Sequence, residues 1–182
     1  MKKVLLFGSG GIIGRFLSKE LSSDFLITKI SRQHISNKVD YSIDLLDIEE
    51  INNFVKKIDE FDCIVYLVGL AHKSEWKNTL SDYSNINLIT LKNLLFVLEK
   101  HRKVPKKIIF ASTVSVYGDN IDKTHYTENS SALPKTFYSL TKLQAENFLK
   151  ENYAKQSWIL RFAPVYSKDI LFNINKRIKF FN

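Results

Sequence analysis

The sequence of 182 residues contains 45% hydrophobic and 25% charged residues and carries a formal net charge of +8 at pH 7. This length favours one soluble domain with a substantial core, and no apolar run approaches the roughly eighteen residues of a membrane span. The basic residues are spread along the chain, so we expect a nucleotide-sized anion as partner and no nucleic acid.

Short apolar runs alternate with longer segments of helical period along the chain. We expect strands at residues 3–8, 25–31, 39–43, 63–69, 107–112 and 158–163. We expect helices at residues 12–22, 47–58, 79–100 and 136–153. Strands that are apolar throughout are buried on both faces, and helices between them connect parallel neighbours. The pattern predicts an α/β fold, a Rossmann-type doubly wound parallel sheet with helices on both faces.

The first strand runs directly into FGSGGIIGRF, which has glycines at three-residue intervals. In a dinucleotide-binding turn, Gly8 permits the tight bend, Gly11 lets a pyrophosphate approach the backbone, and Gly14 lets the helix pack closely on the strand. The phosphate then lies at the positive end of the helix. A turn whose small residues serve packing alone is the alternative interpretation.

Tyr138 and Lys142 in YSLTK are four residues apart on the fourth expected helix, so both lie on one face. An ammonium beside a phenol favours the phenolate, which makes Tyr138 a candidate for proton transfer. A surface pair is the alternative. Ser112 and Thr113 end the fifth expected strand, at the sheet edge where ligands bind, and a hydroxyl there can bond a substrate oxygen or simply cap the strand.

Cys63 is the single cysteine and excludes an internal disulfide framework. Its apolar run, CIVYLVG, indicates a buried structural thiol in a cytoplasmic protein. We predict no metal site, because the histidines have no second ligand at a convincing spacing. These are His34, His72, His101 and His125.

In chain order, the sequence carries GxxGxxG at 8–14, Asp44-Leu45, LVGLAH at 67–72, NLITLKNLL from Asn87, STVSVYG at 112–118, TEN and a proline before YSLTKLQAE, and LRFAPVY at 160–166. This set resembles the extended short-chain dehydrogenase/reductases of the NAD-dependent epimerase/dehydratase type. The matches span about residues 3 to 167, and Thr113 precedes Tyr138 by the twenty-five residues that the resemblance requires.

The resemblance implies a dinucleotide-binding Rossmann domain over residues 1–167, followed by residues 168–182 as the remnant or start of a substrate-binding region. It also implies a nicotinamide cofactor along the sheet edge and a nucleotide-activated sugar as substrate. The cofactor contacts that it implies are Gly8, Gly11, Gly14, Ile12, Ile13, Ser31, Arg32, Asp44, Leu45, Val68, Gly69 and Lys142.

By the same resemblance, Tyr138 exchanges a proton with a sugar hydroxyl while hydride passes between the sugar and the nicotinamide. Thr113 orients the same oxygen. Lys142 binds the cofactor ribose and lowers the pKa of Tyr138. Asn87 matches a position near the site with a structural or relay role.

Two departures from the family pattern narrow the reaction and the cofactor. Sugar dehydratases carry an acid pair directly after the catalytic hydroxyl, where this chain has Val114 and Ser115, so epimerisation or ketosugar reduction is favoured. NAD-preferring members tend to end the second strand with an acid, whereas this strand ends in Ser31 and Arg32. A guanidinium suits a 2′-phosphate, so we favour NADP slightly over NAD, with a solvated loop arginine as the alternative.

Family members usually continue beyond LRFAPVY into a smaller domain that covers the substrate, and here only residues 167–182 follow. We therefore expect weak or absent turnover by this chain alone. The alternatives to an active enzyme are a non-catalytic dinucleotide-binding domain, serving as sensor or scaffold, and a truncated inactive family member. The resemblance further implies a role in polysaccharide biosynthesis and a homodimer in which helices 79–100 and 136–153 form a four-helix bundle.

Overall fold

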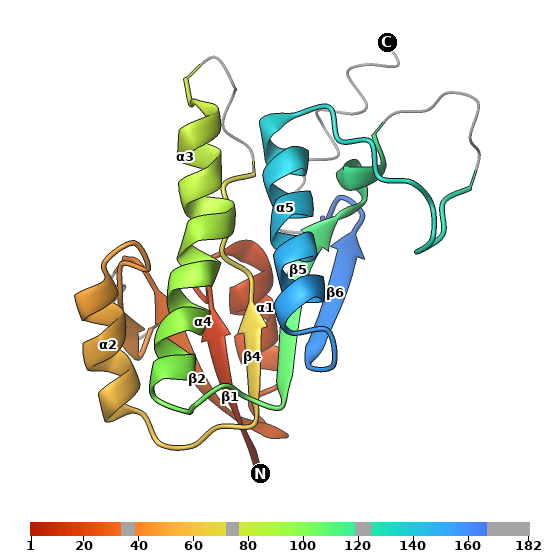
Figure 1. Ribbon diagram of the computed structural model, residues 1–182. Helices are drawn as coiled ribbons and strands as arrows, with labels where there is room; N and C mark the ends of the chain where they lie inside the picture. The colour runs from red at the N-terminus through yellow and green to blue at the C-terminus, as the bar shows by residue number, and fades with distance from the viewer. Residues whose placement is uncertain (34–38, 72–76, 119–124, 167–182) are drawn as a thin grey trace.

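The computed structural model describes residues 1–33, 39–71, 77–118 and 125–166 (Figure 1). Its strands are β1 (Lys2–Phe7), β2 (Phe25–Ser31), β3 (Tyr41–Ser42), β4 (Cys63–Tyr66), β5 (Lys107–Thr113) and β6 (Ser157–Phe162). Its helices are α1 (Ile12–Glu20), α2 (Ile48–Lys57), α3 (Leu80–Ser84), α4 (Thr90–Lys100) and α5 (Phe137–Asn152), with a π-helical turn η1 (Asn85–Ile89) and a 3-10 turn η2 (Val114–Tyr117). The expected C-terminal region 168–182 lies outside the described residues, as do His34 and His72.

The strands form one six-stranded sheet in the order β3-β2-β1-β4-β5-β6. Every neighbouring pair is parallel. The order reverses between β1 and β4, and in such sheets ligands bind outside the carboxyl ends of the strands at this reversal. The predicted doubly wound Rossmann-type sheet is therefore confirmed.

Helix starts are fixed by side chains that the sequence supplies at the right positions. Asp47 caps α2, because its carboxylate accepts hydrogen bonds from the backbone N–H groups of Glu49 and Glu50. Thr136 caps α5 in a reciprocal pair with Ser139, each side chain accepting from the other residue's backbone N–H. The start of α5 sets the direction in which its later residues meet the sheet.

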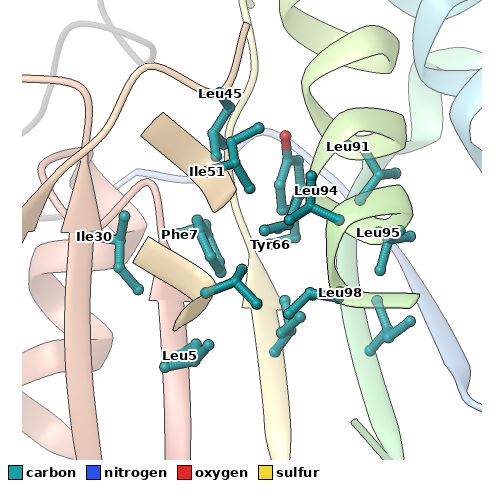
Figure 2. Close-up of a cluster of buried hydrophobic side chains, with 14 of the residues drawn as sticks. Leu5, Phe7, Ile30, Leu45, Ile51, Tyr66, Leu91, Leu94, Leu95 and Leu98 are labelled. Atoms are coloured by element: carbon teal, nitrogen blue, oxygen red, sulfur yellow. The ribbon is translucent and has the colours of Figure 1, made fainter. Parts of the chain in front are cut away.

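The main core lies between the sheet and the helices α2, α4 and α5 (Figure 2). Phe7 and Tyr66 from adjacent strands are fully buried, and their ring centroids are 6.0 Å apart. The Tyr66 hydroxyl donates to Thr90 Oγ1 at 2.7 Å, which satisfies the buried phenol. Helix α4 contributes an apolar stripe that is completely buried, consisting of Leu91, Leu94, Leu95 and Leu98.

The opposite face of the sheet is covered less completely. In Figure 1, α1 lies behind the sheet, while α2, α4 and α5 lie in front of it. Trp158 and Leu160 of β6 are 59% and 39% exposed, whereas Ile159 between them packs against the core. Cys63 was expected to be buried, but it is half-buried in the structure. This partial burial raises the pKa of its thiol. None of the described helices is long and apolar enough to cross a lipid bilayer.

The helix predicted at 79–100 is not continuous. Residues Asn85–Ile89 form the π-helical turn η1, which separates α3 from α4. A π-turn inserts one residue into an α-helix, and such turns are frequent at functional sites. The periodicity of the leucines predicted the helix correctly and could not reveal the extra residue.

Candidate active site

The turn between β1 and α1 requires glycine at two positions for different reasons. Gly8 has a φ of +83°, which disfavours any other residue. At Gly14, a Cβ would lie 2.4 Å from Gly8 O and 2.6 Å from Ser9 Cα, so only glycine lets α1 approach the turn this closely. Gly11 N donates to Gly8 O at 3.1 Å and closes the turn.

The N-cap residue of α1 supplies no side-chain cap to the first turn of the helix. Gly11 is the N-cap residue and offers no side-chain acceptor, and the first turn contains no acidic residue. The first backbone N–H groups of a helix need partners and attract anions. This end of α1 therefore has the chemistry of a phosphate-binding site.

A pocket of about 530 Å³ opens beside this turn, at the carboxyl ends of the first four strands. Its wall includes eight of the predicted cofactor contacts, which are Gly8, Gly11, Ser31, Arg32, Asp44, Leu45, Val68 and Gly69. Ile12, Ile13 and Gly14 do not line it, because they lie within α1, where Gly14 is buried against the turn. The structure thus brings together residues from four separate segments of the sequence.

Arg32 and Asp44 line the part of this pocket next to the ends of β2 and β3. Asp44 Oδ1 accepts from the backbone N–H of Leu46 at 2.9 Å, and Asp44 N donates to Glu50 Oε2 at 2.8 Å. The Arg32 side chain is exposed, and among the described residues its guanidinium has no ion pair. Arg32 is therefore available to an anionic group bound in the pocket.

Tyr138 and Lys142 lie one turn apart on α5, as predicted. Lys142 is buried, with its Nζ 4.0 Å from the centroid of the Phe110 ring. Burial lowers the pKa of Lys142 to about 7, and the negative charge of Glu146 acts against that change. A Cβ on Gly69 would lie 3.9 Å from Lys142 Nζ, so the ammonium lies beside a residue of the pocket wall. Lys142 itself does not line the pocket, and neither do Tyr138 and Thr113.

Thr113 ends β5 and faces this helix. Its hydroxyl donates to Ser115 Oγ and accepts from Ser115 N, both at 3.1 Å, which fixes the start of η2. Burial raises the pKa of Tyr138, while a hydrogen bond with Thr113 acts in the opposite direction. The expected lowering of the Tyr138 pKa by Lys142 is therefore wrong for this structure, because burial is the larger effect and Lys142 is not among its causes.

Asn87 holds three segments together from within η1. It is completely buried, and its Oδ1 accepts from Leu70 N at 2.7 Å. Its Nδ2 donates to Thr141 Oγ1 at 2.9 Å. The side chain thus joins the loop after β4 to Thr141 of α5, the residue that precedes Lys142.

A buried ionic cluster, which was not expected from the sequence, lies one helical turn from Lys142. Glu146 of α5 is completely buried, and Arg161 of β6 donates to it from Nε at 3.0 Å and from Nη2 at 2.5 Å. Ser112 Oγ also donates to Glu146 Oε1, so this hydroxyl is engaged within the protein. Charged residues inside the apolar segments WILRFA and LTKLQAE were the available signal.

No group of three potential metal ligands occurs in the described part of the chain. His101 Nε2 instead shares a 2.7 Å hydrogen bond with Asn52 Oδ1, far from the pocket along α4. His125 is exposed.

Three comparisons with known proteins bear on this arrangement. Residues 4–178 match the model of the NAD dependent epimerase/dehydratase family. An Escherichia coli O157:H7 protein named N-acetyl-alpha-D-glucosaminyl-diphospho-ditrans,octacis-undecaprenol 4-epimerase is 32% identical over 154 residues, covering 84% of this chain and 44% of that protein.

The fold is also similar to solved structures. UDP-glucose 4-epimerase from Brucella ovis in complex with NAD matches with a TM-score of 0.76 at 22% identity, over 88% of this chain and 51% of that one. RMD from Pseudomonas aeruginosa complexed with NADPH matches with a TM-score of 0.74 at 19% identity, over 88% of this chain and 53% of that one. The chain spans about half the length of the curated relatives it matches.

Proposed function

The chain belongs to the NAD-dependent epimerase/dehydratase family, and from this premise we propose that it binds a nicotinamide dinucleotide and epimerises or reduces a sugar carried on a diphosphate. The observation that carries the proposal is the position of Lys142. Its ammonium reaches Gly69 in the wall of the pocket, and Tyr138 lies one turn away on the same helix. The proposed proton-transfer group therefore lies beside the proposed binding pocket, with Gly69 between Lys142 and the pocket.

The residues of the pocket fit a dinucleotide. Two residues of the pocket wall beside the turn, Gly8 and Gly11, have no side chain that could block a pyrophosphate, and Gly11 provides no side-chain cap for the first amides of α1. These amides would hold the pyrophosphate, and Asp44 and Leu45 would border the adenine. When bound, the nicotinamide would supply or accept the hydride.

Thr113 at the end of β5 and two side chains of α5 would carry out the proton transfer. A half-buried, neutral Tyr138 phenol can give a proton to a sugar oxygen, and the phenolate can take it back in the reverse direction. Thr113 would orient that oxygen through its hydroxyl. Lys142 would bind the ribose, and its pKa of about 7 allows it to change charge near neutrality.

Epimerisation or ketosugar reduction remains the proposed reaction in preference to dehydration. Val114 and Ser115 follow Thr113, and both are exposed at the start of η2, so neither position offers an acid for the loss of water. The name of the Escherichia coli relative favours a sugar linked through diphosphate to a lipid, and the family resemblance favours a nucleotide sugar. Both share the sugar diphosphate that we propose as substrate.

NADP is the preferred cofactor in this proposal, since the exposed Arg32 lies in the pocket wall and would pair with a 2′-phosphate. We also retain the homodimer through α3, α4 and α5, which is supported by Phe96, an aromatic residue on α4 that is 61% exposed. A cytoplasmic location and a role in polysaccharide biosynthesis belong to the same proposal.

The experiment begins with calorimetric titration of the purified protein with NADPH and with NADH. Turnover is then assayed with UDP-N-acetylglucosamine, UDP-glucose and a polyprenyl-diphosphate sugar, with Tyr138→Phe as the control. We expect Tyr138→Phe to bind the cofactor as the wild type does and to abolish turnover. Binding without turnover on any substrate would support the non-catalytic dinucleotide-binding alternative, and absence of binding would refute both.

A further inference from the structure

Glu146 is a carboxylate enclosed between α5 and the sheet. It is 0% exposed, and its partners come from three elements: Ser112 of β5, Arg161 of β6 and Lys150 on the next turn of α5. A buried ion pair of this kind is often no more stabilising than apolar side chains of similar volume. The ion pair therefore adds little stability over apolar side chains, and the acid can instead serve to hold its partners in place.

The first group that Glu146 holds is the end of β5. Ser112 and Arg161 are partners in the register between β5 and β6, and both donate to the Glu146 carboxylate. Ser112 immediately precedes Thr113, whose hydroxyl meets Tyr138. Fixing Ser112 against α5 therefore fixes the strand end that carries Thr113 relative to the helix that carries Tyr138.

Arg161 extends the same connection to η2. Its guanidinium carbon lies 4.6 Å from the centroid of the Tyr117 ring, and the Tyr117 hydroxyl donates to Thr127 O at 2.9 Å. Stacking of guanidinium on an aromatic face is favourable and directional. The turn that follows Thr113 is thus anchored to the same carboxylate as the residue that precedes it.

The second group within reach of Glu146 is Lys142, one helical turn earlier on α5. Lys142 is buried and has no hydrogen bond or ion pair to any described residue. Around it lie Tyr138 on its own helix, Phe110 on β5 and Gly69 after β4, none of which carries a negative charge in the neutral state of the tyrosine. Glu146 is the charged group that counteracts the effect of burial on Lys142.

We propose that Glu146 is a positioning residue for the Thr113, Tyr138 and Lys142 group, fixing the end of β5 against α5 and favouring the cationic form of Lys142 over the neutral form. This inference rests on the proposed function for its meaning in catalysis. The structural evidence for it is that the buried Glu146 carboxylate contacts both β5 and β6 and that Glu146 lies one helical turn from Lys142.

The test measures the protonation of the Lys142 side chain as a function of pH. Protein labelled with carbon-13 at lysine Cε is titrated by NMR, and the Lys142 signal is assigned by its loss in Lys142→Met. We expect a wild-type midpoint of about 7. Glu146→Gln keeps the shape and an acceptor for Ser112 but removes the charge, so its Lys142 midpoint is expected to be lower. Glu151→Gln, an exposed acid on the same helix, is the matched control and should leave the midpoint unchanged.

Glu146→Gln leaves the Arg161 guanidinium beside a neutral partner and could destabilise the protein. The double variant Glu146→Gln/Arg161→Met removes both charges, and its Lys142 midpoint should be lowered in the same direction. Equal midpoints in the wild type and the folded Glu146 variants overturn the proposal. Failure of both variants to fold also overturns it, in favour of a purely structural role. The titration needs neither cofactor nor turnover, so a wild type that binds no nicotinamide dinucleotide would count against the proposed function alone.

Discussion

The close approach of α1 to the glycine turn can be tested by adding one methyl group. In Gly14→Ala, the new Cβ would lie 2.4 Å from Gly8 O, whereas ordinary contact begins at 3.4 Å, so the shortfall is 3.4 − 2.4 = 1.0 Å. All three nearest atoms belong to the backbone of residues 8 and 9, which no side-chain rotation can move. Helix α1 must therefore move away from the turn.

The magnitude follows from two opposing effects. Overpacking typically costs about 1–3 kcal/mol, and backbone collisions place this substitution near the upper end, at about 3 kcal/mol. Alanine in a helix interior is more favourable than glycine by about 1 kcal/mol. We expect a net loss of about 2 kcal/mol in the free energy of unfolding, which lowers the melting temperature by about 4–8 °C for a protein of this size.

The assay is thermal unfolding followed by circular dichroism, with Gly11→Ser as the matched variant. Gly11 has a φ of −73° and a ψ of 174° at the N-cap position, where serine is preferred, so this variant should melt close to the wild type. Its hydroxyl would occupy the first amides of α1, and NADH should therefore bind more weakly. A Gly14→Ala protein that melts within about 1 °C of the wild type would refute the argument from close packing.

Three further outcomes are expected. Arg32→Ala should weaken NADPH binding about tenfold to a hundredfold, the effect of losing charge-assisted hydrogen bonds, and leave NADH binding unchanged; equal losses in calorimetry would contradict a contact with the 2′-phosphate. Asn87→Ala should lower the free energy of unfolding in urea by about 1–3 kcal/mol, because Leu70 N–H loses its buried acceptor; a change below about 0.5 kcal/mol would contradict this. Lys142 has a lowered pKa of about 7 against an ordinary 10.5, so the folded state binds fewer protons than the unfolded state between these values and stability rises with pH in that window. In Lys142→Met, the free energy of unfolding measured in urea should rise less across the same pH range. An identical rise in both proteins would contradict the burial of an ionisable Lys142.

The sequence was sufficient for the strands because their apolar runs are short and bounded. All six expected strands occur, and the weak one at 39–43 is reduced to Tyr41–Ser42, since only these residues pair with β2. The glycine turn was predictable as well, because Gly8 and Gly14 leave few alternatives for the backbone. Local patterns with strict geometric requirements are the ones that a sequence reports well.

The buried cluster around Glu146 was beyond such patterns. Glu146 and Arg161 are fifteen residues apart on a helix and a strand, and their contact depends on the packing of α5 on β6. The direction of the Tyr138 pKa shift was missed for the same reason. Spacing places Lys142 on the same helix face, but the extent of burial, which is the larger effect, is set by the tertiary structure.

The π-helical turn changes the directions in which the side chains of α3 point relative to those of α4. Each residue of an α-helix advances by about 100°, so one inserted residue rotates everything before it by roughly that angle relative to everything after it. Tyr83 before the turn packs on Phe137 of α5, while Leu91 and Leu95 after it fill the core. Deletion of a single residue within 85–89 would leave the leucine stripe in the core and turn Tyr83 away from α5. One inserted residue thus lets α3 contact α5 beside the site while α4 packs its leucines into the core.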